Sequence, residues 1–243
     1  MRIVIFLAVL TFAAGCASGA KPDQPYAAGG SSGGSSEPIP TGPGADVKLY
    51  HQGIQAAKSG NVILAEERFR MAVNANGGLV DGWYNLGVAL GKLGRHKEAE
   101  ECFRRAALSR PSDDRIQGAI GFAMAASGYH SKALAHFEAL LQKDPENLAA
   151  RNNLAAVYLA MGRFDQAEEE ARGVIRRDAA YVPALVNLGE VYYRQGKPEL
   201  AATVLSNALR QDQNNGQLLT NLGRYYAEVG DWGQAKGVSH TGC

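Results

Sequence analysis

The sequence predicts an all-α protein in which about six helical hairpins stack side by side as a solenoid. Three kinds of residue recur every 34 positions from Asp46 onward, without an insertion. Glycine stands at 60, 94, 128, 162, 196 and 230, alanine at 65, 99, 133, 167, 201 and 235, and a small residue at 53, 87, 121, 155, 189 and 223. A regular period of this length indicates one helical pair per interval, and such pairs must stack because one hairpin cannot bury both its faces.

The first element has the layout of a secretory signal. Residues 1–15 have one positive charge at Arg2, an apolar run over residues 3–12 and small residues just before Cys16. The apolar run is too short to span a bilayer. We therefore expect the leader to direct export and to be removed.

The second element is the cysteine at the end of that leader. The segment Ala-Ala-Gly-Cys resembles a bacterial lipobox, with Ala13 in place of the usual leucine. The resemblance implies that the chain is cut before Cys16, that Cys16 is acylated, and, with Ala17 next to it, that the anchor is in the outer membrane and faces the periplasm. Two or three acyl chains hold a protein firmly at a membrane. The alternative is an ordinary signal that is cut after Ala20.

The third element, residues 16–45, is predicted to be a disordered tether. After Cys16 it holds five of the nine prolines and the run GGSSGGSS, while its charged residues are Lys21, Asp23 and Glu37. Such a segment cannot bury enough apolar surface to offset the entropy lost on ordering. As a flexible coil it would average roughly 30 Å end to end and reach about 100 Å fully stretched.

The solenoid is predicted to cover residues 46–243. In the unit 80–113, Gly94 interrupts an apolar-periodic run, and a second run begins near Lys97. Pro183 and Pro198 fall where first helical turns are expected, a position that proline tolerates. The units are 46–79, 80–113, 114–147, 148–181, 182–215 and 216–243. We expect the last unit to be incomplete, because its second helix would start near Gly233 and no polar capping helix follows.

The repeat pattern resembles the tetratricopeptide repeat. The residues that carry the resemblance in the second unit are Trp83, Leu86, Gly87, Ala99, Phe103 and Pro111. The departures elsewhere are Gln52 for an inner leucine, Ala171 for the large residue of the fourth unit, and Ala179 and Gln213 for the terminal proline. The resemblance implies a right-handed superhelix whose first helices line an inner groove that binds protein.

The first helix of each unit has a stripe at its positions two, five, nine and twelve, which share one helical face. We expect this stripe to line the groove and to receive an amphipathic helix or an extended apolar segment. The predicted partner-binding residues are Tyr50, Ile54, Tyr84, Val88, Phe122, Leu159, Val186 and Tyr193. The stripe also includes Glu190 and Arg224, but no cluster of Lys, Arg and Asn that would clamp a carboxylate. The alternative for the larger apolar members is simple packing against neighbouring helices.

The sequence indicates binding rather than catalysis. The histidines have no metal-ligand spacing and no partner for a nucleophile, so we expect no catalytic residue, metal, cofactor or small-molecule substrate. Three cysteines, Cys16, Cys102 and Cys243, support no disulfide framework. A net charge of +1 gives no electrostatic reason to expect nucleic acid or an anionic membrane surface as the ligand.

The order of leader, acylated cysteine, tether and repeats resembles the pilotins of type IV pili, the PilF, PilW and Tgl kind. This resemblance implies a lipid-anchored scaffold that binds a secretin subunit and helps the pore localise or multimerise in the outer membrane. The alternative is an adaptor or regulator of another envelope system, in cell-wall synthesis or hydrolysis or in gliding motility. A secretin that co-purifies would favour the first function, and a cell-wall enzyme the second.

Overall fold

The computed structural model describes residues 42, 44–210, 213–231 and 233. Within these residues the chain forms eleven α-helices and no strand, which confirms the predicted all-α class. The helices are α1 (Ala45–Lys58), α2 (Val62–Ala75), α3 (Val80–Lys92), α4 (His96–Ser109), α5 (Asp114–Ala126), α6 (His130–Lys143), α7 (Leu148–Ala160), α8 (Phe164–Arg177), α9 (Val182–Arg194), α10 (Pro198–Leu209) and α11 (Gly216–Glu228).

The helices follow the 34-residue period. Each of the first five units holds two helices, and α11 is the first helix of the sixth. Pro183 and Pro198 lie in the first turns of α9 and α10, where the sequence placed them. The leader 1–15, Cys16, nearly all of the tether and the second helix of the last unit beyond Gly233 lie outside the described residues.

The same turn closes every hairpin. The glycines at 60, 94, 128, 162, 196 and 230 all have φ between +72° and +82°, the left-handed region that favours glycine. After each glycine, the next backbone N–H donates to the carbonyl five residues before it, as Asn61 N does to Ala56 O at 2.9 Å. This bond satisfies a carbonyl at the end of the first helix. Identical turns keep the units in register.

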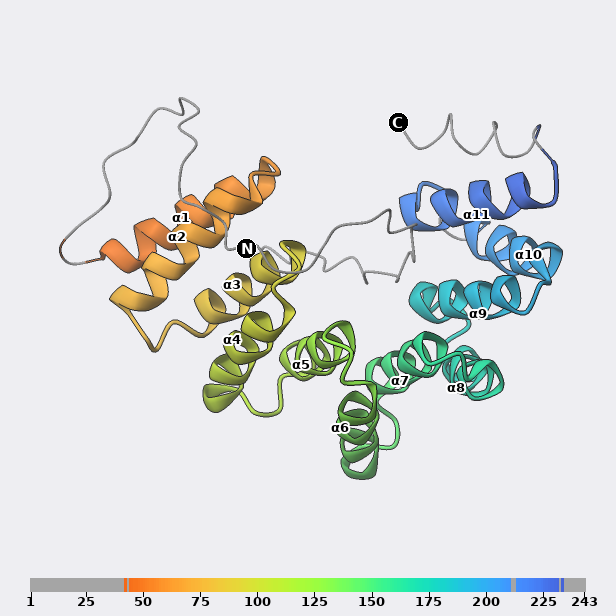
Figure 1. The fold of residues 1–243 in the computed structure, drawn as a ribbon, viewed down its shortest axis with the longest axis horizontal. Coiled ribbons are helices and arrows are strands. Elements are labelled where there is room, and N and C mark those ends of the chain that lie inside the picture. Colours follow the sequence, from red (N-terminus) through yellow and green to blue (C-terminus); the bar gives the residue numbers. More distant parts are fainter. Residues whose placement is uncertain (1–41, 43, 211–212, 232, 234–243) are drawn as a thin grey trace.

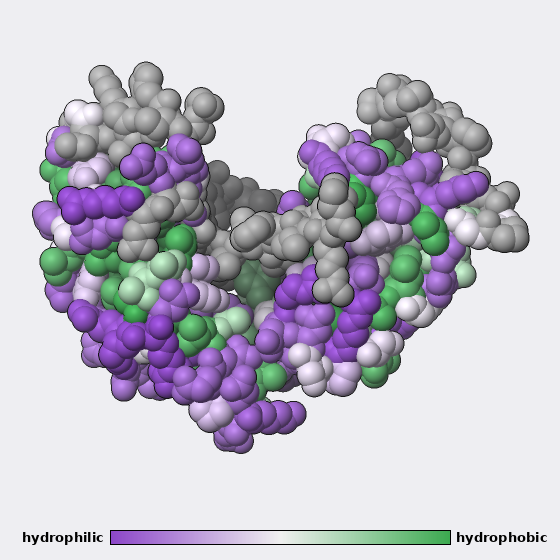
Figure 2. Space-filling model, turned by 180° about the vertical axis from the view of Figure 1, so that it is seen from behind, coloured by the Kyte–Doolittle hydropathy of each residue, from purple (hydrophilic) through white to green (hydrophobic). Residues whose placement is uncertain are grey.

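The stacked hairpins form an arc. Helices α5, α7 and α9 lie on its inner side, and α4, α6, α8 and α10 lie on its outer side (Figure 1). The space-filling view shows the hollow between the two ends of the array (Figure 2). Helices pack mainly against their chain neighbours, and α7 also packs against α5 and α9. This arrangement is the predicted solenoid, with the first helices facing the hollow.

The buried side chains fall into two clusters along the arc. The first runs from Ile54 to Val191 and the second from Ala155 to Tyr225. They interleave over α7, α8 and α9; in α7, for example, Leu154 belongs to the first cluster and Ala155 to the second. No helix among the described residues has both the length and the apolar character needed to cross a bilayer.

Candidate partner-binding surface

Close helix packing within each hairpin orients the inner face. In the first three units a glycine of the first helix lies against a phenylalanine ring of the second. A Cβ atom at Gly53 or Gly87 would lie 2.6 Å from a ring carbon, and one at Gly121 only 2.2 Å from the ring of Phe137. A side chain at these glycines would therefore push the helices apart. Glycine at these positions thus allows the two helices of each hairpin to lie close together.

Tyrosines line the N-terminal part of the inner face. Tyr50 packs on the ring of Phe69 at 5.8 Å between centroids, and Tyr84 packs on Phe103 at 5.6 Å. Both tyrosines are half-buried. Burial raises the pKa of Tyr84 to about 12, so its hydroxyl is protonated at neutral pH. Each ring thus presents a neutral edge with one polar atom, which suits a partner that is mostly apolar.

The predicted groove residues differ in what they offer to a partner. Tyr50, Tyr84, Val88, Phe122 and Tyr193 are half-buried and keep accessible surface. Ile54, Leu159 and Val186 are buried, Val186 with only 1% of its surface exposed. Val186 packs in the second buried cluster, beneath the surface of the inner face. It therefore offers a partner almost no accessible surface.

The C-terminal part of the inner face is polar. Glu190 of α9 is buried and forms an ion pair with Arg224 of α11, which lies 34 residues later at the same unit position. The hydroxyl of Tyr225 donates to Glu190 Oε2 at 3.1 Å. The Arg224 guanidinium also lies 4.8 Å from the ring of Tyr193, and that ring stacks on Tyr225 at 5.0 Å. These four side chains, the α9–α11 cluster, join two units through charge and aromatic contact.

Burial governs the chemistry of the α9–α11 cluster. Tyr225 is fully buried, and its burial, together with the carboxylate of Glu190, raises its pKa. Its hydroxyl therefore keeps its proton and can serve as a hydrogen-bond donor. Sequence reasoning placed Glu190 and Arg224 in the stripe but missed Tyr225 and the ion pair. The signal that could have found the pair was opposite charge at one unit position in adjacent units.

Two of the asparagines that recur at one unit position, Asn85 and Asn187, form hydrogen bonds between first helices. Asn85 Nδ2 donates to the hydroxyl of Tyr50 at 3.0 Å. Asn187 Nδ2 donates to Asn152 Oδ1 at 2.9 Å, and both asparagines are buried. A buried amide needs such partners, because an unpaired polar group away from water is costly. These residues hold neighbouring units together.

The described residues hold little that suits catalysis. They contain no group of three or more His, Cys, Asp and Glu side chains that could bind a metal ion. Cys102 is a buried free thiol, and burial raises its pKa to about 11, which makes it a poor nucleophile at neutral pH. His136 is partly buried with Nε2 2.9 Å from Gln117 O, and burial lowers its pKa. Both side chains have packing roles.

Comparison with known families identifies the repeats. Three family models described as tetratricopeptide repeats match residues 80–113, 124–188 and 186–235, together more than half of the chain. No curated protein sequence matches the chain.

Solved structures share the fold at low sequence identity. The tetratricopeptide repeat protein TTC0263 of Thermus thermophilus has a TM-score of 0.63 and 20% identity, with 76% of this chain and 98% of that one covered. PilW, described as a widely conserved type IV pilus biogenesis factor, has a TM-score of 0.59 and 16% identity, covering 79% and 90%. PilF of Pseudomonas aeruginosa has a TM-score of 0.54 and 19% identity, covering 79% and 88%. At these identities the likeness is one of fold.

Proposed function

Because the chain belongs to the tetratricopeptide repeat family, we propose that it is a scaffold that holds a protein partner in its inner groove. In this proposal the scaffold is tied by lipid to the periplasmic face of the outer membrane. Its partner is a secretin subunit of a type IV pilus, whose localisation or multimerisation it assists. The protein acts by binding, without catalysis.

The observation that carries the proposal is the composition of the inner face. From α1 to α5 it presents Tyr50, Tyr84, Val88 and Phe122, which are large and half-exposed. This is a run of apolar anchors of the kind that receives one face of an amphipathic helix or an extended apolar segment. Toward α11 the surface becomes polar, with Arg224 paired to Glu190. A partner segment that is apolar over most of its length and polar at one end fits this order.

The choice of partner rests on architecture. PilW and PilF share the fold, and PilW is described as a pilus biogenesis factor. The proposed leader, acylated Cys16 and tether add the anchored arrangement of a pilotin. A partner held near an anchored scaffold meets the membrane at high local concentration, which favours assembly there.

Capture of the partner tests the groove. Tagged wild-type protein from detergent-solubilised membranes should co-purify with the secretin. Phe122→Glu and Tyr84→Glu should each lower the captured amount at least tenfold, because a charge would be buried against an apolar segment. The control is Leu108→Glu, which places the same charge on a second helix at a side chain that is 84% exposed, and which should capture normally.

Three results would contradict the pilotin assignment. One is a secretin that still forms pores in a strain that lacks the protein. Another is capture of a cell-wall hydrolase or synthase in place of the secretin, which would favour the adaptor function. The third is unchanged capture by both groove variants with intact helicity, which would move the binding site elsewhere.

The anchor has its own test. Cys16→Ala should release the protein from membranes that have been washed at high salt, because the acyl chains would be missing. The readout is the share of protein in the membrane pellet. Full retention after the wash would refute lipidation at Cys16 and leave the groove proposal intact.

A further inference from the structure

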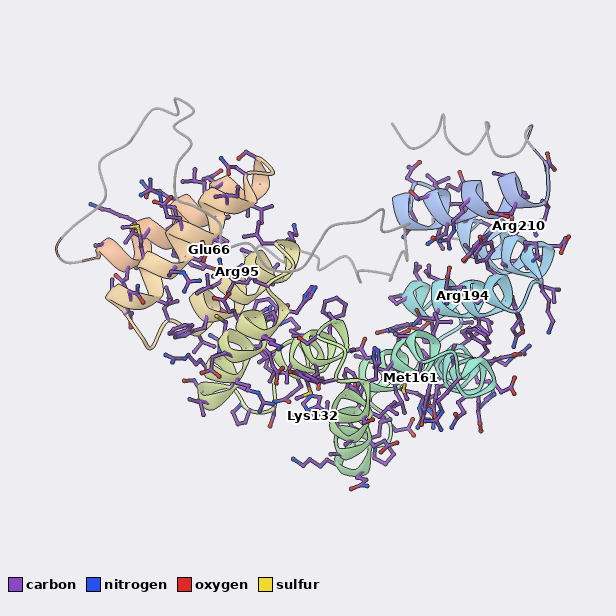
Figure 3. The ribbon with its side chains drawn as sticks, viewed as in Figure 1. Glu66, Arg95, Lys132, Met161, Arg194 and Arg210 are labelled. Carbon is purple, nitrogen blue, oxygen red and sulfur yellow. The ribbon has the colours of Figure 1, made fainter. Side chains whose placement is uncertain are left out.

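The turns within the hairpins lie along one edge of the array. Each turn joins a first helix to a second helix, and the 34-residue period repeats it in register. We call residues 58–64, 92–98, 126–132, 160–166 and 194–200 the hairpin-turn edge. Four of its side chains are labelled in Figure 3, where Arg95, Lys132, Met161 and Arg194 follow the arc in chain order.

The hairpin-turn edge is basic in its first three turns. Residues 58–64, 92–98 and 126–132 hold five cationic side chains against the one carboxylate of Glu98, a formal charge of +4. The opposite edge of the same units, residues 75–81, 109–115 and 143–149, holds three cations against five carboxylates, a formal charge of −2. The near-zero net charge of the whole chain conceals this asymmetry.

The lysines of this edge form no ion pairs within the part of the chain that the structure describes. Every ion pair among those residues uses an arginine, as Arg95 does with Glu98 and Glu66. The described lysines are 48, 58, 92, 97, 132, 143 and 197, and five of these seven lie on the hairpin-turn edge. Their charges are therefore available to an external anion, while most arginine charge is already neutralised by carboxylates.

Large apolar side chains are exposed on the same edge as these lysines. Ile63 is 72% exposed at the start of α2, and Leu93 is exposed at the end of α3. Tyr129, 38% exposed, lies between two lysines, with Lys132 Nζ 4.8 Å and Lys97 Nζ 5.7 Å from its ring centroid. Tyrosine and lysine together are typical of protein surfaces that rest at the boundary between lipid headgroups and acyl chains.

We propose that the first three turns of the hairpin-turn edge bind the surface of an anionic lipid bilayer. The four lysines at 58, 92, 97 and 132 supply electrostatic attraction to the headgroups, and Ile63, Leu93 and Tyr129 enter the interface. This contact needs no acyl chain, so it is independent of the proposed anchor. It would lay the N-terminal half of the arc on the membrane.

Vesicle flotation tests this contact. The protein is the mature chain from residue 16 with Cys16→Ser, which has neither leader nor acyl group. It should float with phosphatidylcholine vesicles that contain about 30% phosphatidylglycerol and not with pure phosphatidylcholine, and binding should fall at least tenfold between about 50 and about 300 mM NaCl. The variant K58Q/K92Q/K97Q/K132Q should bind at least tenfold more weakly, since each lysine near an anionic surface contributes substantially.

Two controls make the test specific. K48Q/K143Q/R176Q/R210Q removes the same charge from outside the hairpin-turn edge and should bind within about twofold of the parent, because binding depends on which edge faces the lipid. I63S/Y129S keeps every charge and should bind vesicles about fivefold more weakly, because apolar contact is lost. The same variant should bind the soluble polyanion heparin as the parent does.

Several outcomes would overturn the proposal. Equal binding to both vesicle types, or equal loss in the two charge variants, would show that the edge has no special affinity for anionic lipid. Normal vesicle binding by I63S/Y129S would reduce the contact to a general attraction for polyanions. A concentration-dependent dimer that K58Q/K92Q/K97Q/K132Q abolishes would assign the edge to a second copy of the chain.

Discussion

The two ends of the arc are built from the same repeat and are held together differently. In the first three units a phenylalanine ring fills the space that a glycine leaves in the facing helix. In the fourth unit both positions are alanine, at Ala155 and Ala171, and both are fully buried. In the fifth, Gly189 faces Leu205 less tightly, since a Cβ atom there would lie 3.2 Å from the leucine, and polar contacts take over between α9 and α11.

The difference shows that the repeat preserves close contact between its two helices and not residue identity. A glycine with a phenylalanine and an alanine with an alanine both bring the two helices into contact. Because close packing is complementary on both sides of a contact, a change on one side requires a change on the other. The fourth unit lies in the stretch where the two core clusters interleave, and its small pair belongs to the second of them.

The largest expected effect comes from breaking this complementarity. Ala171→Phe should lower the free energy of unfolding by about 3 kcal/mol, because the ring would collide with the Cβ of Ala155. Ala155→Gly in the same chain should restore at least half of the loss, by recreating the glycine–phenylalanine pair. Urea denaturation followed by circular dichroism measures both. If the double variant were no more stable than Ala171→Phe alone, the complementarity argument would be wrong.

The next effect tests the charged contact of the C-terminal half. Arg224→Met should lower the free energy of unfolding by about 2 kcal/mol, because the buried carboxylate of Glu190 would lose its nearer cationic partner and keep only Arg194 at 3.8 Å. Glu190→Leu with Arg224→Met should cost less than the single change. The contrasting pair in the N-terminal half is Arg110 with Asp81, whose side chains are 44% and 50% exposed, and Arg110→Met should cost less than about 1 kcal/mol. Equal losses of unfolding free energy at the two sites would contradict the distinction between a buried and an exposed ion pair.

The smallest expected effect is a change of folding stability with pH that arises from two histidines of the N-terminal half. Burial lowers the pKa of His136, with Arg104 adding to the shift and Glu100 opposing it, and burial also lowers the pKa of His96. The unfolded chain therefore binds protons more readily than the folded one, and stability falls as the pH drops below the ordinary histidine value of about 6.5. His136→Gln should reduce the loss of unfolding free energy between about pH 7 and pH 5 by less than about 1 kcal/mol, measured by urea denaturation at each pH. An unchanged pH profile would exclude His136 as a contributor.

Much of the fold follows from the sequence because it depends on local and periodic features. Gly94 and its equivalents ended the first helices as expected, since the left-handed turn favours glycine. The 34-residue spacing placed two helices in each complete unit. Asn85 and Asn187, which share one unit position, both form hydrogen bonds between helices.

The candidate surface was less predictable, because exposure depends on packing between units. A helical stripe shows which residues share a face, but not how deeply each lies in the contact with the next unit. Val186 has the stripe position of Tyr50 and Tyr84, yet it lies in the second buried cluster. The contact of Tyr225 with Glu190 joins residues of two units, 35 positions apart, and has no counterpart in the earlier repeats.

Contacts restricted to neighbours give the arc a mechanical property. Since each unit packs mainly on the next, a small rotation at every junction adds up along the chain and changes the distance between the ends most. The scaffold can then deform elastically. The strain of admitting a wider or narrower partner segment is distributed over all junctions between units. Residues of both buried clusters are present in α7, α8 and α9, so the two halves share core over several junctions and the change in curvature is not concentrated at one of them.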